Sequence, residues 1–193
     1  EKNKIKFIGL PTDRIKEDNL RLLRYFRFVG VYCSNEQQLH LKSLNACIEN
    51  FSKIKALSKE RVQIEFNKLL LSKNVSFALI ILKKYNLLNF LINGLQKMSN
   101  KSINALNKLP KEKIIRTAYL IKEAKIKLVD LNESIKISNR NVVKLQNILS
   151  IKRIIKSEND AKIHKYYYGE EVALINYKLN QFINKNKVNN KIL

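Results

Sequence analysis

Glycine and proline are scarce in this sequence, because its 193 residues include only four Gly and two Pro. Sandwiches and barrels need many tight turns, and these two residue types supply much of the backbone geometry that such turns require. Hydrophobic residues nevertheless make up 45% of the chain, which is enough to fill a core at this length. Long helices joined by short polar connections satisfy both conditions, so we predict an all-α protein.

The chain is strongly basic, with 38 Lys and Arg against 16 Asp and Glu and a formal net charge of +22. Lys, Asn and Ile are all abundant, as expected of an A/T-rich coding sequence, and part of the excess has that origin. Codon bias does not explain the scarcity of acidic residues, and a positive field attracts phosphate backbones. The charge therefore favours nucleic acid as partner, ahead of an anionic membrane surface.

No segment of the sequence is typical of a membrane or secreted protein. The longest apolar run, Phe77–Leu82, is far shorter than the roughly 20 residues that cross a bilayer. No signal peptide is recognisable, so we predict a soluble, cytoplasmic protein without a membrane partner. Cys33 and Cys47 form no CxxC and have no histidine at zinc-ligand spacing, so we predict no metal site.

Hydrophobic periodicity predicts the first elements of the chain. Alternating residues at Lys4–Ile8 predict a short extended arm that enters a turn at Gly9–Pro11. The apolar spacing then predicts one continuous helix from about Asp13 to Tyr32. Ser34 and Gln37 form a capping-box pattern, which predicts that the next helix begins there.

The remaining helices are predicted from the same spacing, with Ser58 as the N-cap of a third helix that carries Val62 and Phe66 on its apolar face. Further helical stretches are predicted at Val75–Tyr85, Leu87–Leu95, Ile103–Leu109, Lys111–Lys125, Asn139–Lys156, Glu158–Tyr168 and Glu170 to about Asn184, before a Lys/Asn tail at Lys185–Leu193. Because the residue composition becomes richer in Asn, Ser and Lys beyond Met98, we predict a division of the chain into domains 1–97 and 98–193.

Charged residues are ordered along the first predicted helix. Glu17 and Asp18 precede Arg21 by four and three residues, so on a helix both carboxylates could hold its guanidinium. Arg21, Arg24 and Arg27 repeat every three residues, and a helix rises about 13 Å from Asp18 to Arg27, the length of a nucleoside triphosphate. We predict a base near the first pair and phosphates towards the last two arginines.

An Asp/Arg pair suits cytosine and adenine, because the carboxylate accepts from an exocyclic amino group while the guanidinium donates to ring acceptors. Guanine and uracil are disfavoured by the same pair. The alternative interpretation is a row of solvated ion pairs, each contributing on the order of a few tenths of a kcal/mol.

Two segments resemble a known family. Phe7–Phe28 (FIGLPTDRIKEDNLRLLRYFRF) is similar to the neck-helix motif EDxLRxxRxxRF of class II tRNA nucleotidyltransferases (CCA-adding enzymes) and the related bacterial poly(A) polymerases. Ser58–Leu70 resembles the family's next motif, RxxxExxK, while Ser134–Leu149 and Tyr166–Ala173 resemble its helical body and tail. Leu10 departs from the pattern, because the family has Asp there in FIGDP.

The resemblance implies a neck in domain 1–97 and a tRNA-binding body and tail in domain 98–193. The nucleotide site that it implies consists of Asp18, Arg21, Arg24 and Arg27. Its supporting residues are Glu17, Arg61, Glu65 and Lys68. In this scheme the first two residues of the site face the base, Glu17 orients the guanidinium of Arg21, and the other supporting residues hold the neck helix against its neighbour.

The family's catalytic head is not recognisable in the sequence, since no Gly-Ser motif is followed by the DxD carboxylates that hold two magnesium ions. We therefore expect no cofactor bound by this chain alone, with ATP and CTP as substrates, magnesium bound by the head, and tRNA as partner. A separate head polypeptide is a further expected partner, without which the chain is expected to be inactive. Poly(A) addition, a non-catalytic helical RNA-binding module and a structural helical domain remain the alternatives.

Overall fold

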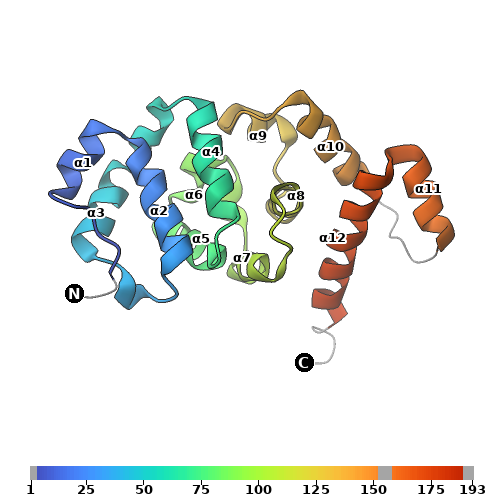
Figure 1. Cartoon of the computed structure of the whole chain (residues 1–193), viewed down its shortest axis with the longest axis horizontal. Coiled ribbons are helices and arrows are strands. Elements are labelled where there is room, and N and C mark those ends of the chain that lie inside the picture. Colours follow the sequence, from blue (N-terminus) through green and yellow to red (C-terminus); the bar gives the residue numbers. More distant parts are fainter. Residues whose placement is uncertain (1–3, 152–157, 189–193) are drawn as a thin grey trace.

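The computed structural model describes residues 4–151 and 158–188, with side chains placed for 4–151 and 159–183. The prediction of an all-α protein is confirmed over these residues. The α-helices are α1 Pro11–Glu17, α2 Leu20–Tyr32, α3 Leu41–Asn50, α4 Lys59–Leu70, α5 Val75–Lys84, α6 Leu88–Leu91, α7 Asn100–Ala105, α8 Lys113–Ala124, α9 Leu128–Ser134, α10 Asn139–Ser150, α11 Glu158–Tyr168 and α12 Glu170–Val188. Short 3-10 helices lie at η1 Glu36–Gln38, η2 Phe51–Ala56, η3 Leu95–Lys97 and η4 Leu106–Lys108. The helices follow one another along an elongated body, with α1 and α3 at one end and α11 and α12 at the other (Figure 1).

The residues before α1 form the expected extended arm. Ile5 pairs with Leu39 in an isolated parallel bridge, and its backbone amide donates to the carbonyl of Gln38 at 2.9 Å. The amide of Phe7 donates to Oγ of Ser43 at 3.2 Å. These contacts hold the arm against the start of α3, where it forms one wall of a pocket described below.

The prediction of one continuous helix over Asp13–Tyr32 is wrong, because the helix breaks after Glu17 and restarts at Leu20. Asp18 has an extended backbone, with φ −156° and ψ 111°. Its Oδ1 accepts a hydrogen bond from the backbone amide of Leu20 at 3.0 Å. A side chain that satisfies a free amide at a new helix start competes with helix continuation, which explains the break.

The predicted cap formed by Ser34 and Gln37 is also wrong. The capping box lies one residue later, between Asn35 and Gln38, and it encloses η1 instead of α3. α3 begins after His40, whose ring nitrogen accepts from the backbone amide three residues further on. The sequence pattern therefore indicated a cap in this region, but it did not predict the short 3-10 turn η1 between α2 and α3.

Ser58 caps α4 as predicted, since its hydroxyl accepts from the backbone amide of Arg61. The predicted helix at Val75–Tyr85 is confirmed as α5. α9 was missed, because seven residues give the apolar period too little length to stand out.

Two of the later predictions extend beyond the described residues. The predicted helix Asn139–Lys156 is α10 as far as Ser150, and its last residues, from position 152 on, are not described. α12 passes its predicted end near Asn184 and continues to Val188. The final part of the predicted tail likewise lies outside the described residues. The domain boundary near residue 97 stays a prediction.

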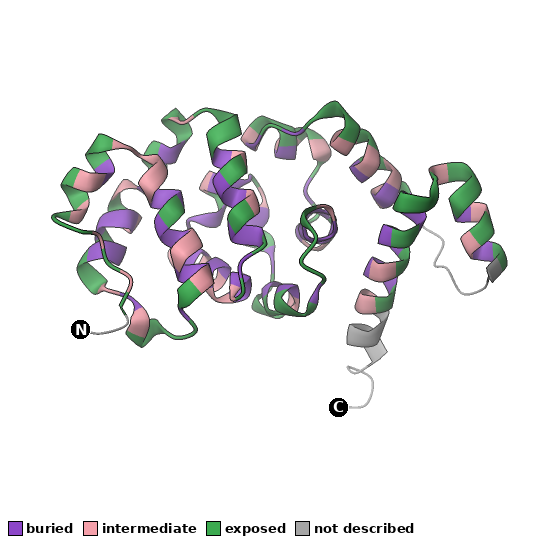
Figure 2. Cartoon of the chain, viewed as in Figure 1, coloured by how far each residue is buried: buried purple, intermediate pink, exposed green. Residues whose placement is uncertain are grey.

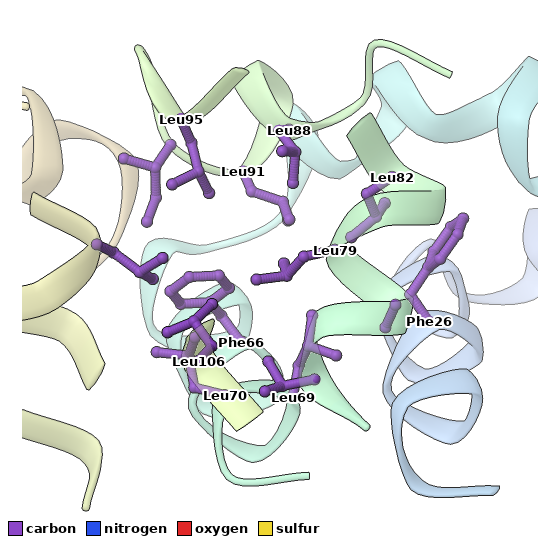
Figure 3. Close-up of a cluster of buried hydrophobic side chains, with 14 of the residues drawn as sticks. Phe26, Phe66, Leu69, Leu70, Leu79, Leu82, Leu88, Leu91, Leu95 and Leu106 are labelled. Atoms are coloured by element: carbon purple, nitrogen blue, oxygen red, sulfur yellow. The ribbon is translucent and has the colours of Figure 1, made fainter. Parts of the chain in front are cut away.

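Helices of the first half enclose a continuous apolar core, and their outer faces are exposed (Figure 2). Side chains from α2, α4, α5, α6, η3 and η4 meet in it (Figure 3): Phe26, Phe66, Leu69, Leu70, Leu79, Leu82, Leu88, Leu91, Leu95 and Leu106. α2 contacts both α4 and α5, so this core fixes the position of the helix with the ordered arginines. Among the described helices, none is long and apolar enough to span a bilayer.

A glycine permits the close approach of α2 and the end of α4. A Cβ atom at Gly30 would lie 2.5 Å from Oγ of Ser72 and 3.1 Å from Cδ1 of Leu69. The carbonyl of Gly30 accepts from the backbone amide of Asn74 at 2.7 Å. A larger residue at position 30 would force the side chains of Ser72 and Leu69 to shift, because their atoms occupy the space.

Arg116 is fully buried in α8, and within the described residues its guanidinium donates only to backbone carbonyls. Nη2 donates to Leu109 at 3.1 Å, Nε donates to Pro110 at 3.2 Å, and Nη1 donates to Leu70 at the end of α4. Desolvation lowers the pKa of this guanidinium. Arg116 thereby ties the end of α4 to the segment that enters α8.

Candidate nucleotide-binding site

The guanidinium of Arg21 is held by two groups of α1. Its Nη1 lies 2.7 Å from Oε2 of Glu17 and donates to the backbone carbonyl of Arg14 at 3.0 Å. The other oxygen of Glu17 accepts from Nη1 of Arg14 at 2.8 Å. Desolvation by itself raises the pKa of Glu17, but the two arginines outweigh it and lower that pKa below its ordinary value. A short helix therefore fixes the direction of Arg21.

Asp18 does not share Arg21 with Glu17, contrary to the sequence prediction. Its two carboxylate oxygens accept from Nη2 of Arg61 on α4, both at 2.9 Å. The break in the helix explains the difference, because the extended backbone of Asp18 turns its side chain away from α2. The amide of Leu20, and then Arg61, lower the pKa of Asp18 below its ordinary value.

Asp18 still has hydrogen-bonding capacity left. Oδ1 accepts from both Leu20 and Arg61, whereas Oδ2 accepts from Arg61 alone among the described residues. A carboxylate oxygen has about two acceptor directions. One direction at Oδ2 is therefore open to an incoming amino group.

Arg27 does not line an open site as predicted, because it faces α4. Its Nε lies 2.9 Å from Oε2 of Glu65, although the two atoms are not aligned for a hydrogen bond. Glu65 is 5% exposed, and its other oxygen accepts from Nζ of Lys68 at 3.0 Å. The Arg27 guanidinium also lies over the ring of Phe28, 4.4 Å from its centroid. Glu65 thus connects α4 to α2, Lys68 pairs with Glu65 within α4, and Arg61 connects α4 to Asp18 between α1 and α2.

A pocket of about 360 Å³ lies between the arm and α2. Its lining consists of Ile5, Lys6, Phe7, Ile8, Arg14, Arg21, Arg24, Tyr25 and Phe28. Phe7 stacks on Tyr25 with ring centroids 5.6 Å apart, which gives the pocket a rigid aromatic wall. Arg24 is exposed, and no ion pair or hydrogen bond engages it within the described part of the chain. An anionic ligand with a flat apolar portion would complement this lining.

The structure groups the predicted residues differently from the sequence. Arg21 and Arg24 share the pocket, Asp18 lies at the start of α2 outside its lining, and Arg27 belongs to the α2–α4 interface. Arg14 was missed, although its position three residues before Glu17 was an available signal. The arm residues could not be assigned to the pocket from the sequence, since their place depends on tertiary contacts.

Metal ligands are not gathered in the described residues, where no three side chains of His, Cys, Asp or Glu lie close enough to hold an ion. Cys33 and Cys47 are buried free thiols, and desolvation raises the pKa of each. Both thiols are therefore protonated at neutral pH.

Comparison with known proteins relates these features to an enzyme family. Residues 38–98 match the family described as "Probable RNA and SrmB- binding site of polymerase A". The chain is 33% identical over 87 residues to the mitochondrial CCA tRNA nucleotidyltransferase 1 of Danio rerio, an alignment covering 45% of this chain and 20% of that protein. It is 31% identical over 87 residues to the CCA-adding enzyme of Staphylococcus epidermidis, covering 45% and 21%.

The fold agrees with these matches. The crystal structure of the Bacillus stearothermophilus CCA-adding enzyme in complex with CTP superposes on 94% of this chain with a TM-score of 0.75, at 22% identity. The described chain is thus a helical module of the kind found in nucleotidyltransferases. More specifically, the sequence and fold matches support a fragment of the class II CCA-adding enzyme and poly(A) polymerase family. The alignment covers 46% of the crystallised enzyme and about a fifth of the curated relatives, at 20% and 21%.

Proposed function

We propose that this chain is the nucleotide-selecting and tRNA-binding part of a tRNA nucleotidyltransferase that adds CCA to tRNA 3′ ends. The observation that carries the proposal is the fixed guanidinium of Arg21, held by Glu17 and the Arg14 carbonyl beside a cationic pocket. Arg21 donates to the ring acceptors of cytosine or adenine, and the open direction at Oδ2 of Asp18 accepts the exocyclic amino group. Arg24 binds the phosphates, since its charge has no partner among the described residues.

In this proposal the chemistry belongs to a catalytic head with a DxD pair, in the same polypeptide or a separate one. The carboxylates of that head would hold the magnesium ions, which would supply the hydroxyl activation and charge stabilisation that nucleotidyl transfer needs. Arg27 has a different role from the one first predicted: it braces α2 against Glu65 and does not touch the nucleotide. Poly(A) addition is the second candidate, because the family that matches residues 38–98 is described as a binding site of polymerase A.

The first test changes the base-reading residue. In a protein that joins this chain to a competent family head, Arg21→Ala is expected to lose the preference for CTP and ATP over GTP and UTP. Fold stability should change little, because the Arg21 side chain is 27% exposed and its ion pair is partly solvated. Incorporation of each nucleotide into tRNA lacking its 3′ end measures the effect. Discrimination equal to that of the parent protein would refute the role of Arg21.

The second test concerns tRNA. Affinity of the chain for tRNA is expected to fall steeply as salt rises, because each phosphate contact releases condensed counterions, with a slope of about −0.9 per contact in duplex regions. Fluorescence anisotropy of labelled tRNA between low and physiological salt measures this slope. A flat response would contradict tRNA binding through the basic surface.

A further inference from the structure

A second groove lies away from the nucleotide pocket, where η2 and the first turn of α4 meet α6 and α9. Its volume is about 510 Å³. It is lined by Ile54, Lys55, Leu57, Lys59, Val62, Asn89, Phe90, Asn93, Glu133 and Ser134. A volume in the range of about 300–1,000 Å³ with an apolar floor and a few polar groups is typical of a ligand site.

The floor of the groove is apolar and carries an aromatic ring. Ile54 and Val62 are buried beneath it. Phe90 is fixed from behind by an edge contact with Phe51, with ring centroids 6.1 Å apart. The ammonium of Lys55 lies over the Phe90 ring, 5.1 Å from its centroid. The ring therefore has a face that a flexible and exposed side chain covers.

Charges on the two walls have opposite signs. Lys55 and Lys59 lie on the wall formed by η2 and α4, whereas Glu133 lies on the α9 wall. No ion pair engages any of these three side chains within the described residues. A ligand with an anionic end and a hydrogen-bond-donating end matches this arrangement better than a simple anion does, since Glu133 would repel the latter.

We propose that this groove binds one nucleotide of an RNA strand. The phosphate draws Lys55 off the ring and lies between Lys55 and Lys59, the base stacks on Phe90, and an exocyclic amino group donates to Glu133. The segment 38–98, which matches an RNA-binding family, contains the whole lining except Glu133 and Ser134. This inference rests on the proposed function, because it requires that the chain binds RNA. It adds an RNA contact in this groove, outside the site proposed to read the incoming base.

The test uses the full chain and a fluorescein-labelled single-stranded oligoadenylate of eight nucleotides, with anisotropy as readout. Lys55→Gln/Lys59→Gln is expected to weaken binding about tenfold and to reduce the salt slope by about 0.7, since the two lysines hold one phosphate and each phosphate neutralised on a single strand contributes about 0.7. Phe90→Leu keeps the floor apolar and is expected to weaken binding about tenfold through lost stacking. Lys108→Gln/Lys111→Gln is the matched control, because it removes the same charge from exposed positions outside the groove.

Equal weakening by the groove variant and the control variant would overturn the proposal, because it would show a general effect of charge. Wild-type affinity of Phe90→Leu would also overturn it. Thermal unfolding of each variant checks that the fold is intact. If tRNA binds with a steep salt dependence while the groove variant behaves as the control, the groove inference fails and the proposed function stands. Absence of binding to both RNAs would refute the two together.

Discussion

Arg27 in the α2–α4 interface and Arg116 in α8 are both largely shielded from solvent, but their guanidinium groups have different kinds of partner. Arg27 in α2 meets a buried carboxylate, Glu65, which also holds Lys68. Arg116 in α8 is fully buried and donates to three backbone carbonyls without a carboxylate. The first arrangement joins side chains of two helices, and the second joins a side chain to backbone at the end of a helix and in a loop.

The difference indicates what each contact fixes. An ion pair between side chains sets the register of two helices, and either partner retains some freedom to reach solvent, as the 20% exposure of the Arg27 side chain shows. Carbonyl groups cannot be withdrawn from a buried guanidinium without moving the chain itself. We therefore expect Arg116 to contribute more to the free energy of unfolding than Glu65, and Glu65 more than the exposed pairs near Asp18.

Arg116→Met is expected to have the largest effect on stability. It leaves three buried carbonyls without their donor, so the free energy of unfolding should fall by about 3 kcal/mol. Urea unfolding followed by circular dichroism measures the change. Arg24→Met is the matched control, with an expected change within about 0.5 kcal/mol because that side chain is exposed. Similar values for the two variants would remove the distinction between the regions.

Glu65→Gln is expected to have an intermediate effect. The substitution keeps the side-chain volume but leaves Arg27 without its counter-charge, so the free energy of unfolding should fall by about 2 kcal/mol. This is less than the full penalty for breaking a buried ion pair, because the side chains of Arg27 and Lys68 both reach solvent. A double-mutant cycle with Arg27→Gln isolates the pair, and a coupling energy above about 1 kcal/mol is expected. No coupling would show that the bracing of α2 comes from apolar packing alone.

Asp18→Asn is expected to have the smallest effect, and the effect should depend on pH. The folded-state pKa of Asp18 is lowered by the Leu20 amide and Arg61, so its contribution to stability is present above the unfolded pKa. It is lost as pH falls through the lowered folded-state pKa. The free energy of unfolding of the parent should exceed that of the variant by at most about 1 kcal/mol at pH 7, and the two should converge once pH falls below the lowered folded-state pKa. A difference that persists in acid would point to the hydrogen bonds instead of the charge.

Local patterns predicted most of the helices, and they failed where a tertiary contact decided the outcome. The apolar spacing of α4 and α5 was sufficient because each helix buries one face against the same core. The helix break at Asp18 was not predicted, because the apolar periodicity continues through it without interruption. The pair Asp18–Asn19 was an available signal, since both residue types are frequent at helix starts. Burial of Arg116 was not predicted either. Its place among the apolar residues of α8 was a signal, but its acceptors come from segments that the sequence does not bring together.

The same limits apply to the candidate site. The Glu17–Arg21 pair was predictable from helical spacing and is present at 2.7 Å. The partner of Asp18 was not, since Arg61 follows it by 43 residues. The arginine row suggested one linear site, whereas the structure directs Arg24 to the pocket and Arg27 to the helix interface.

Gly30 lies near the C-terminal end of α2, so a change in helix tilt at this residue is amplified along the helix towards its N-terminus. Arg21 lies nine residues towards the N-terminus, about 13 Å along the axis. A side chain that tilted the helix by about five degrees at Gly30 would displace Arg21 by about 1 Å, and misplacement of that size is enough to reduce a reaction rate on the order of a hundredfold. Under the proposed function, the position of Arg21 in the nucleotide site would therefore depend on the missing Cβ of Gly30, a residue outside the pocket lining.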